Sequence, residues 1–266
     1  MQSSDRSSFP SAPQAALLLL AGFVLQYFLG AALYDLRLSL GFSREQVIAF
    51  VMLLANGILI TVMMHIRGMT YRDLLHPSKA SPLATLIFLV PPVLLVTPLL
   101  VLLDGALVNG LEFVFPVSAW EEQAFTTMIE SSIPAFVETC LIAPAVEEML
   151  FRGILLRSFL ARYPRGLAIG YSALYFGAAH LNIYQFFVAF LLGLLLGLLY
   201  ERSRSLIPTI AMHAAVNVCI FLWGNPNDTA SVLNISAAST YAWVLSLMAA
   251  CTGAIALLKL LAAKGN

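Results

Sequence analysis

Charged residues are scarce in this sequence. Only 11% of its 266 residues are Asp, Glu, Lys or Arg, 60% are hydrophobic, and the mean hydropathy is strongly positive. A soluble domain usually carries about a quarter charged residues, because its surface has to be polar. This shortage excludes an ordinary soluble domain. The 14 basic and 14 acidic residues balance to zero and form no basic patch, so we expect no nucleic-acid partner.

Cysteine is also rare. The three cysteines, Cys140, Cys219 and Cys251, are odd in number, and each lies inside an apolar run. This placement favours buried thiols over a disulfide framework.

Long apolar runs, in contrast, recur along the whole chain. A run of about 20 residues crosses roughly 30 Å of hydrocarbon, so we predict an all-α fold, a polytopic membrane helical bundle with about eight transmembrane helices. The expected spans are residues 15–34, 47–65, 83–103, 133–155, 166–181, 184–200, 206–224 and 240–261. We interpret the first as a span rather than a signal peptide, because it is longer than the usual signal core. The third contains Pro91, Pro92 and Pro98 and should be kinked or broken.

The basic residues are distributed unevenly over these spans. With eight spans, only Arg37 and Arg44 fall on the side opposite the N-terminus. The other twelve are Arg6, Arg67, Arg72, Lys79, Arg152, Arg157, Arg162, Arg165, Arg202, Arg204, Lys259 and Lys264. The positive-inside rule then places both termini in the cytoplasm. The chain ends in "LLAAKGN" without a eukaryotic retention signal, which favours a bacterial inner membrane.

Three charged side chains interrupt the apolar stretch "APAVEEMLFRG". An ionisable group in hydrocarbon costs roughly 2.5–3.5 kcal/mol, so it usually faces a cavity or a partner. Helical positions four apart share a face, whereas neighbours differ by about 100°. Glu148 and Arg152 are therefore predicted to pair, while Glu147 points to another side and is available for proton chemistry.

Two further polar sets follow at the same spacing. Phe176 and His180 lie four apart in "YFGAAHLN", and His213 and Asn217 lie four apart in "MHAAVN". Small residues between them would let another helix or a substrate approach. For Phe176 and His180, an aromatic residue stacked on a structural histidine is the alternative. Counting about 1.5 Å per residue from the flanking basic residues, all three sets reach similar depths and should line a cavity open to the cytoplasm.

The ordered motifs EExxxR, FxxxH and HxxxN on successive apolar helices resemble the CPBP family of intramembrane proteases, also called Abi. That family includes the CAAX-processing endopeptidases and bacterial relatives linked to bacteriocin processing and immunity. The resemblance covers roughly residues 130–225. It divides the chain into N-terminal transmembrane helices with an outer loop (1–130), a CPBP-like catalytic core (131–225), and an outer loop with a C-terminal helix (226–266).

The resemblance implies an intramembrane endopeptidase that hydrolyses peptide bonds of membrane-associated or lipidated proteins or peptides within the lipid bilayer. Glu147 matches the catalytic glutamate that activates a water molecule, and His180 matches the residue that holds this water. His213 and Asn217 match the pair that faces the developing oxyanion. Such roles suit these groups, because hydrolysis needs an activated water and an oxyanion stabiliser.

Three other residues match supporting positions of the family. Glu148 and Arg152 correspond to its supporting ion pair, as their spacing already indicated, and Phe176 belongs to the same motif as His180.

A zinc-dependent mechanism is the main alternative to a metal-free one within this family resemblance. Glu147, His180 and His213 could bind zinc with a water as fourth ligand. However, the sequence contains no HExxH motif, and such a set would leave no second carboxylate as base unless Glu148 left Arg152. We therefore expect no cofactor and a metal-independent, glutamate-type mechanism.

Two other classes of protein remain as alternatives. A catalytically inactive membrane partner, such as a bacteriocin-immunity or scaffold protein, would keep the helices but would tolerate loss of Glu147. A proton-coupled transporter would also embed Glu and His, but transporter folds usually show inverted repeats with broken helices in both halves. Here only the triple-proline span suggests a broken helix.

Overall fold

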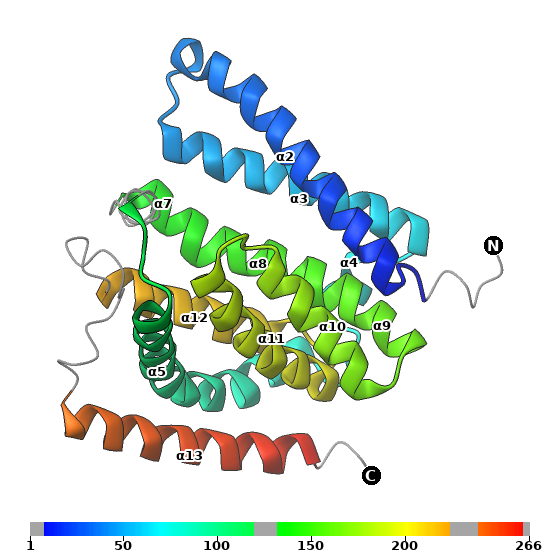
Figure 1. The fold of residues 1–266 in the computed structure, drawn as a ribbon. Helices are drawn as coiled ribbons and strands as arrows, with labels where there is room; N and C mark the ends of the chain where they lie inside the picture. Colours follow the sequence, from blue (N-terminus) through cyan, green and yellow to red (C-terminus); the bar gives the residue numbers. More distant parts are fainter. Residues whose placement is uncertain (1–7, 120–131, 224–238, 263–266) are drawn as a thin grey trace. The chain divides into compact units, whose positions relative to one another are not determined.

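The computed structural model describes residues 8–119, 132–223 and 239–262, which form helices and short connections without any strand (Figure 1). The predicted all-α class is confirmed. The chain forms two compact units, each assembled from two separate stretches of sequence: residues 1–77 with 133–206, and residues 78–132 with 207–266. The segment 131–225, which was delimited by its motifs, contributes to both units.

The first unit begins with a helical hairpin, α2 packed against α3 (Figure 1). Ser11 caps the start of α2 in a capping box with Gln14, and Gly41 ends this helix in the left-handed conformation, with φ 70°. The Ser43 hydroxyl accepts a hydrogen bond from the Gln46 backbone N–H and starts the next helix. The bounds are α2 Ala12–Leu40, α3 Arg44–Arg67 and the short α4 Tyr71–Leu75.

The segment that carries the EExxxR motif is helical without interruption from residue 133 to residue 162. Two stretches of it have the wider π-helical geometry, in which a backbone N–H bonds five residues back instead of four. The successive pieces are α7 Ile133–Val137, the π-helix η1 Glu138–Ile142, α8 Ala143–Glu148, the π-helix η2 Met149–Leu156 and α9 Arg157–Arg162. The backbone is right-handed at every junction, so the helix continues across each change of geometry.

Helices α10 (Arg165–Ala178) and α11 (Ile183–Ser203) pack closely against each other in the same unit. A Cβ added at Gly193 would lie 3.0 Å from the Ala173 Cα, and one at Gly197 would lie 3.0 Å from Ile169. Small residues four apart allow helices this close. The sequence places Gly193 and Gly197 four residues apart, a spacing that predicts this close packing, and the structure confirms it.

The second unit consists of α5 (Pro82–Val114), α12 (Ile207–Trp223) and α13 (Thr240–Ala262). Helix α5 packs against both of the others. It contains Pro91, Pro92 and Pro98 and was predicted to be kinked or broken; it is one continuous helix, and Figure 1 shows it bent along its length.

Five described helices are long and apolar enough to cross a membrane: α2, α3, α5, α11 and α13. Helix α12 is apolar but shorter. The predicted span 133–155 falls on the continuous helical segment 133–162, called the composite helix below, and the predicted span 166–181 falls on α10. The chain is therefore a multi-pass membrane protein, while the number of eight spans and the cytoplasmic termini stay predictions.

Candidate active site

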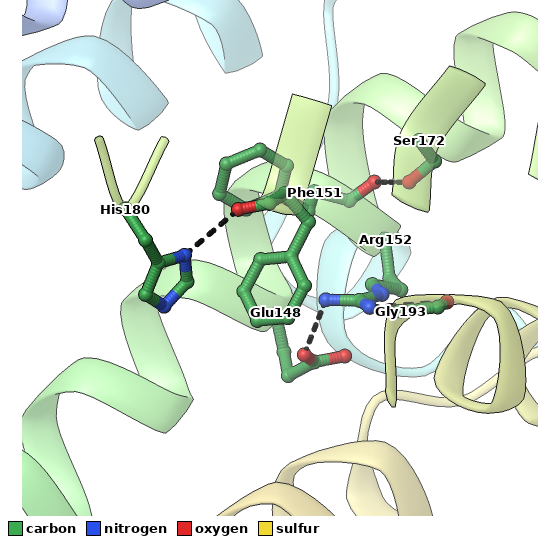
Figure 2. A network of polar contacts seen from close by, with 7 residues as sticks. Glu148, Phe151, Arg152, Ser172, His180 and Gly193 are labelled. Carbon is green, nitrogen blue, oxygen red and sulfur yellow. Dashed lines mark hydrogen bonds and ion pairs between the residues drawn. The ribbon is translucent and has the colours of Figure 1, made fainter. Parts of the chain in front are cut away.

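The centre of the first unit holds a buried ion pair. Arg152 Nη1 donates to Glu148 Oε1 at 2.6 Å, and both side chains are 0% exposed (Figure 2). Glu148 is the last residue of α8 and Arg152 lies in the π-helix η2. The predicted pairing of these two residues is confirmed. Each residue neutralises a charge that would otherwise be very costly to bury.

Arg152 is also held by two groups from other helices. Its Nη2 donates to the Gly193 carbonyl of α11 at 3.2 Å. Its guanidinium carbon lies 4.4 Å from the centre of the Phe176 ring of α10, a cation–π contact. The arginine thus links three helices around one carboxylate. The sequence indicated Glu148 and Phe176 as supporting residues, but nothing in it pointed to the Gly193 carbonyl.

A second bond fixes α10 to the π-helical segment. The buried Ser172 hydroxyl of α10 donates to the Phe151 carbonyl of η2 at 3.0 Å (Figure 2). Backbone carbonyls are open to such partners where the regular hydrogen-bond pattern of a helix changes. Ser172 was missed by sequence reasoning, because a single serine in an apolar helix carries no motif.

His180 lies directly after α10, and its own helix holds it. Its Nδ1 is 2.9 Å from the Phe176 carbonyl, and the two rings meet edge to face, with centres 5.3 Å apart. A carbonyl can only accept a hydrogen bond, so this contact places the proton on Nδ1. In a neutral imidazole, Nε2 is then the acceptor. The contact between the Phe176 and His180 rings, which the sequence analysis gave as the structural alternative, is therefore present. This contact leaves Nε2 of His180 able to bind water.

The turn that carries His180 is tight and strained. Leu181 has a positive φ of 54°, a conformation rare for any residue other than glycine. The Asn182 side chain then caps α11 by accepting from the backbone N–H groups of Tyr184 and Gln185. A Cβ at Gly177 would lie 2.7 Å from the Phe186 carbonyl. The absence of a side chain at Gly177 therefore allows α11 to pack close to this end of α10. Strain of this kind is often found at functional sites.

Glu147 differs from its neighbour Glu148. Its side chain is partly exposed, whereas Glu148 is fully buried. Glu147 also interacts electrostatically with Glu138 and with Arg152. Arg152 therefore acts on both carboxylates, although it forms its ion pair with Glu148. The difference in exposure is what separates the two carboxylates.

His213 and Asn217 lie on α12, in the second unit. They are four residues apart on one α-helix and therefore share a face. His213 is 4% exposed and Asn217 is half-buried. Their position relative to Glu147 and His180 stays a prediction from the motifs.

The donor set was also tested for a metal site. No group of three or more His, Cys, Asp or Glu side chains that could hold a metal ion occurs within residues 8–119, 132–223 and 239–262. Within the first unit, Glu147 and His180 supply two of the three zinc ligands considered above, and the third, His213, belongs to the second unit. The metal-free mechanism therefore stays a prediction.

These features define a class: a multi-pass, all-α membrane protein with glutamate, arginine and histidine side chains set within apolar helices. The comparison with family models specifies the class further. Residues 129–219 match the family described as type II CAAX prenyl endopeptidase Rce1-like. The resemblance to the CAAX-processing proteases is thereby confirmed over this segment.

The match covers about a third of the 266 residues, and the sites predicted from the motifs all fall inside it. They are Glu147, Glu148, Arg152, Phe176, His180, His213 and Asn217. Neither the curated proteins nor the solved structures provide a match.

Proposed function

We propose that this CAAX-type protein is a glutamate-type intramembrane endopeptidase, in which Glu147 is the general base. The buried network around Arg152 is the observation that carries this proposal. It commits Glu148 to a structural role at 2.6 Å from Arg152, while Glu147 on the adjacent position keeps a partly exposed side chain. A general base has to reach water, and of the two glutamates only Glu147 does so.

His180 is proposed to hold the attacking water. The Phe176 carbonyl binds its Nδ1, so Nε2 can accept a hydrogen bond from the water that Glu147 deprotonates. The Phe176 ring contacts both His180 and Arg152. One aromatic side chain thereby couples the orientation of the histidine to the buried ion pair.

His213 and Asn217 are proposed to bind the oxyanion. A protonated imidazole nitrogen and a side-chain amide can each donate a hydrogen bond to the oxygen that becomes negative when water attacks the peptide carbonyl. Their spacing on α12 presents both donors on one helix face.

The proposed substrates are membrane-associated or lipidated proteins or peptides, cleaved without a metal ion. The helices that carry the site are apolar, and a substrate held at the membrane would reach them without leaving the bilayer. The bacterial inner membrane remains the proposed location.

Replacement of Glu147 by glutamine tests the function. Glu147→Gln keeps the shape and removes the base, so cleavage should fall by about 10²–10⁴-fold, with little change in expression or detergent stability. The measurement is to co-express the wild type or the variant with a library of membrane proteins and to compare the cleaved products. Glu45→Gln, a glutamate in the first turn of α3, is the control and should cleave as the wild type does.

Two results would contradict the proposal. Full cleavage by Glu147→Gln would remove the glutamate mechanism, and the absence of any cleavage by the wild type would favour an inactive membrane partner. Metal analysis of the purified active protein tests the metal-free part separately. Stoichiometric zinc that is lost together with activity would show that a metal is required.

A further inference from the structure

Three arginines lie near one buried tyrosine, Tyr200 of α11. The Tyr200 side chain is 0% exposed and interacts electrostatically with Arg157, Arg204 and Arg67. Its hydroxyl has no hydrogen-bond partner among the described residues. A buried hydroxyl left without a partner costs about 1–3 kcal/mol. Arginine cannot accept a hydrogen bond, so the proton of this hydroxyl points to an additional acceptor.

Backbone carbonyls hold two of these arginines in place. Arg67, the last residue of α3, donates from Nη1 to the Ile154 carbonyl at 3.0 Å. Arg157, the first residue of α9, donates to the Asp73 carbonyl. The two guanidinium groups are close enough to act electrostatically on each other. The carbonyls position two like charges side by side, although they contribute no negative charge themselves.

The third arginine occupies a strained backbone position. Arg204 follows α11 with φ 52° and ψ 41°, the left-handed conformation that glycine usually supplies at the end of a helix. For another residue this conformation costs roughly 1–2 kcal/mol. Its backbone N–H donates to the Tyr200 carbonyl at 2.8 Å, and its side chain is exposed. The strain brings a third cation next to Tyr200.

Two acidic residues of the described part of the chain, Asp73 and Glu201, lie near these arginines. Asp73 acts on Arg157, and hydrogen bonds from the Thr70 hydroxyl and backbone lower the pKa of Asp73, so it carries one negative charge at neutral pH. Its side chain is partly exposed and screened by water. Glu201 is engaged by Arg165 at 2.9 Å and by Arg202 at 3.4 Å. Within the described residues, neither Arg157 nor Arg204 forms an ion pair, so these two side chains keep positive charge near the tyrosine.

The location of the cluster indicates what neutralises it. Arg67 ends α3 and Arg204 directly follows α11, and both helices are long and apolar enough to cross the membrane. The arginines therefore lie where the hydrocarbon ends and lipid phosphates begin. The positive-inside rule predicts that this is the cytoplasmic side, whose leaflet is rich in anionic lipids.

We propose that Arg67, Arg157 and Arg204 bind the phosphate group of an anionic phospholipid, and that the Tyr200 hydroxyl donates to one of its oxygens. Guanidinium groups suit this ligand, because their planar fork matches two phosphate oxygens at once. The exposed Arg204 side chain is the part that can move to admit the headgroup. This site does not depend on the protease activity.

Lipid binding by the intact protein tests the site. Purified full-length protein is placed in nanodiscs of phosphatidylcholine with increasing phosphatidylglycerol, and bound phosphatidylglycerol is measured by native mass spectrometry. Arg157→Gln and Arg204→Gln should each weaken phosphatidylglycerol binding about tenfold, as expected for one charge-assisted hydrogen bond. Tyr200→Phe should weaken it about three- to tenfold. Arg44→Gln, an exposed arginine at the opposite end of α3, is the matched control and should leave binding unchanged.

Two outcomes would overturn the proposal. Equal phosphatidylglycerol binding by all four variants and the wild type would show a diffuse attraction to the anionic surface instead of a built site. A parallel titration with inorganic phosphate in detergent separates the two sources of the ligand. If inorganic phosphate binds as tightly and shows the same dependence on Arg157 and Arg204, the ligand is a soluble phosphate compound and the lipid assignment is wrong.

Discussion

Helix α5 of the second unit has more internal prolines than the composite helix of the first unit, and yet its helical geometry is the more regular of the two. Helix α5 contains three internal prolines and remains one continuous α-helix. The composite helix contains Pro134 and Pro144, near the starts of α7 and α8, and yet changes to π-helical geometry twice. The second change, at Met149–Leu156, contains no proline. Proline is therefore not what makes the motif helix irregular.

The difference follows from what each helix has to bury. Helix α5 buries mainly apolar and small residues against its neighbours, so a bend is enough to accommodate the missing N–H groups. The composite helix buries a full ion pair and offers the Phe151 carbonyl to Ser172. Single turns of π-helix are frequent at functional sites. The comparison suggests that polar contacts, rather than sequence breakers, set the backbone where the chemistry is placed.

Breaking the ion pair should have the largest effect on folding. Arg152→Ala leaves the Glu148 carboxylate buried without its cation, which should lower the free energy of unfolding by about 3–5 kcal/mol. Folded yield after size-exclusion chromatography and thermal unfolding in detergent measure this loss. The double variant Glu148→Leu with Arg152→Met removes both charges and should recover much of the yield. A fully stable Arg152→Ala protein would show that polar contacts do not determine this helix.

A change in the packing of α5 should have an intermediate effect. A Cβ at Gly253 of α13 would lie 2.4 Å from the Pro92 carbonyl and 3.0 Å from the Leu95 Cβ. Gly253→Ala should therefore destabilise the protein by about 1–3 kcal/mol, measured as a lower unfolding temperature. Gly57→Ala in α3 is the matched control, because a Cβ there meets nothing within 4 Å, and it should be neutral or slightly stabilising. Equal effects of both variants would contradict this packing.

Removal of one proline from α5 should have the smallest effect. Pro98→Ala restores a backbone N–H and removes the ring, but the bent helix has already adapted to both. We expect the free energy of unfolding to change by no more than about 1 kcal/mol, less than the usual cost of proline inside a helix. The measurement is thermal unfolding of Pro98→Ala. Leu103→Ala, at an exposed position on the same helix, is the control. A large loss of folded protein would mean that the bend itself is required.

The sequence was sufficient to predict the features that depend on composition or on residue spacing within a single helix. The shortage of charge indicated a membrane protein, and the four-residue spacing of Glu148 and Arg152 predicted their pairing, because one turn of helix brings such positions together. The glycines of α11 predicted close packing for a similarly local reason. The motifs also located the segment that the family comparison matched.

Only the tertiary structure determined the contacts between helices. The Gly193 carbonyl on Arg152, the Ser172 hydroxyl on Phe151 and the gathering of arginines at Tyr200 join residues far apart in sequence. No spacing rule predicts them, because they depend on how closely two helices approach and on which backbone carbonyls are left open. The proton on His180 Nδ1 was decided in the same way: the spacing of Phe176 and His180 is visible in the sequence, but the bond to the Phe176 carbonyl forms only where α10 ends and turns into α11.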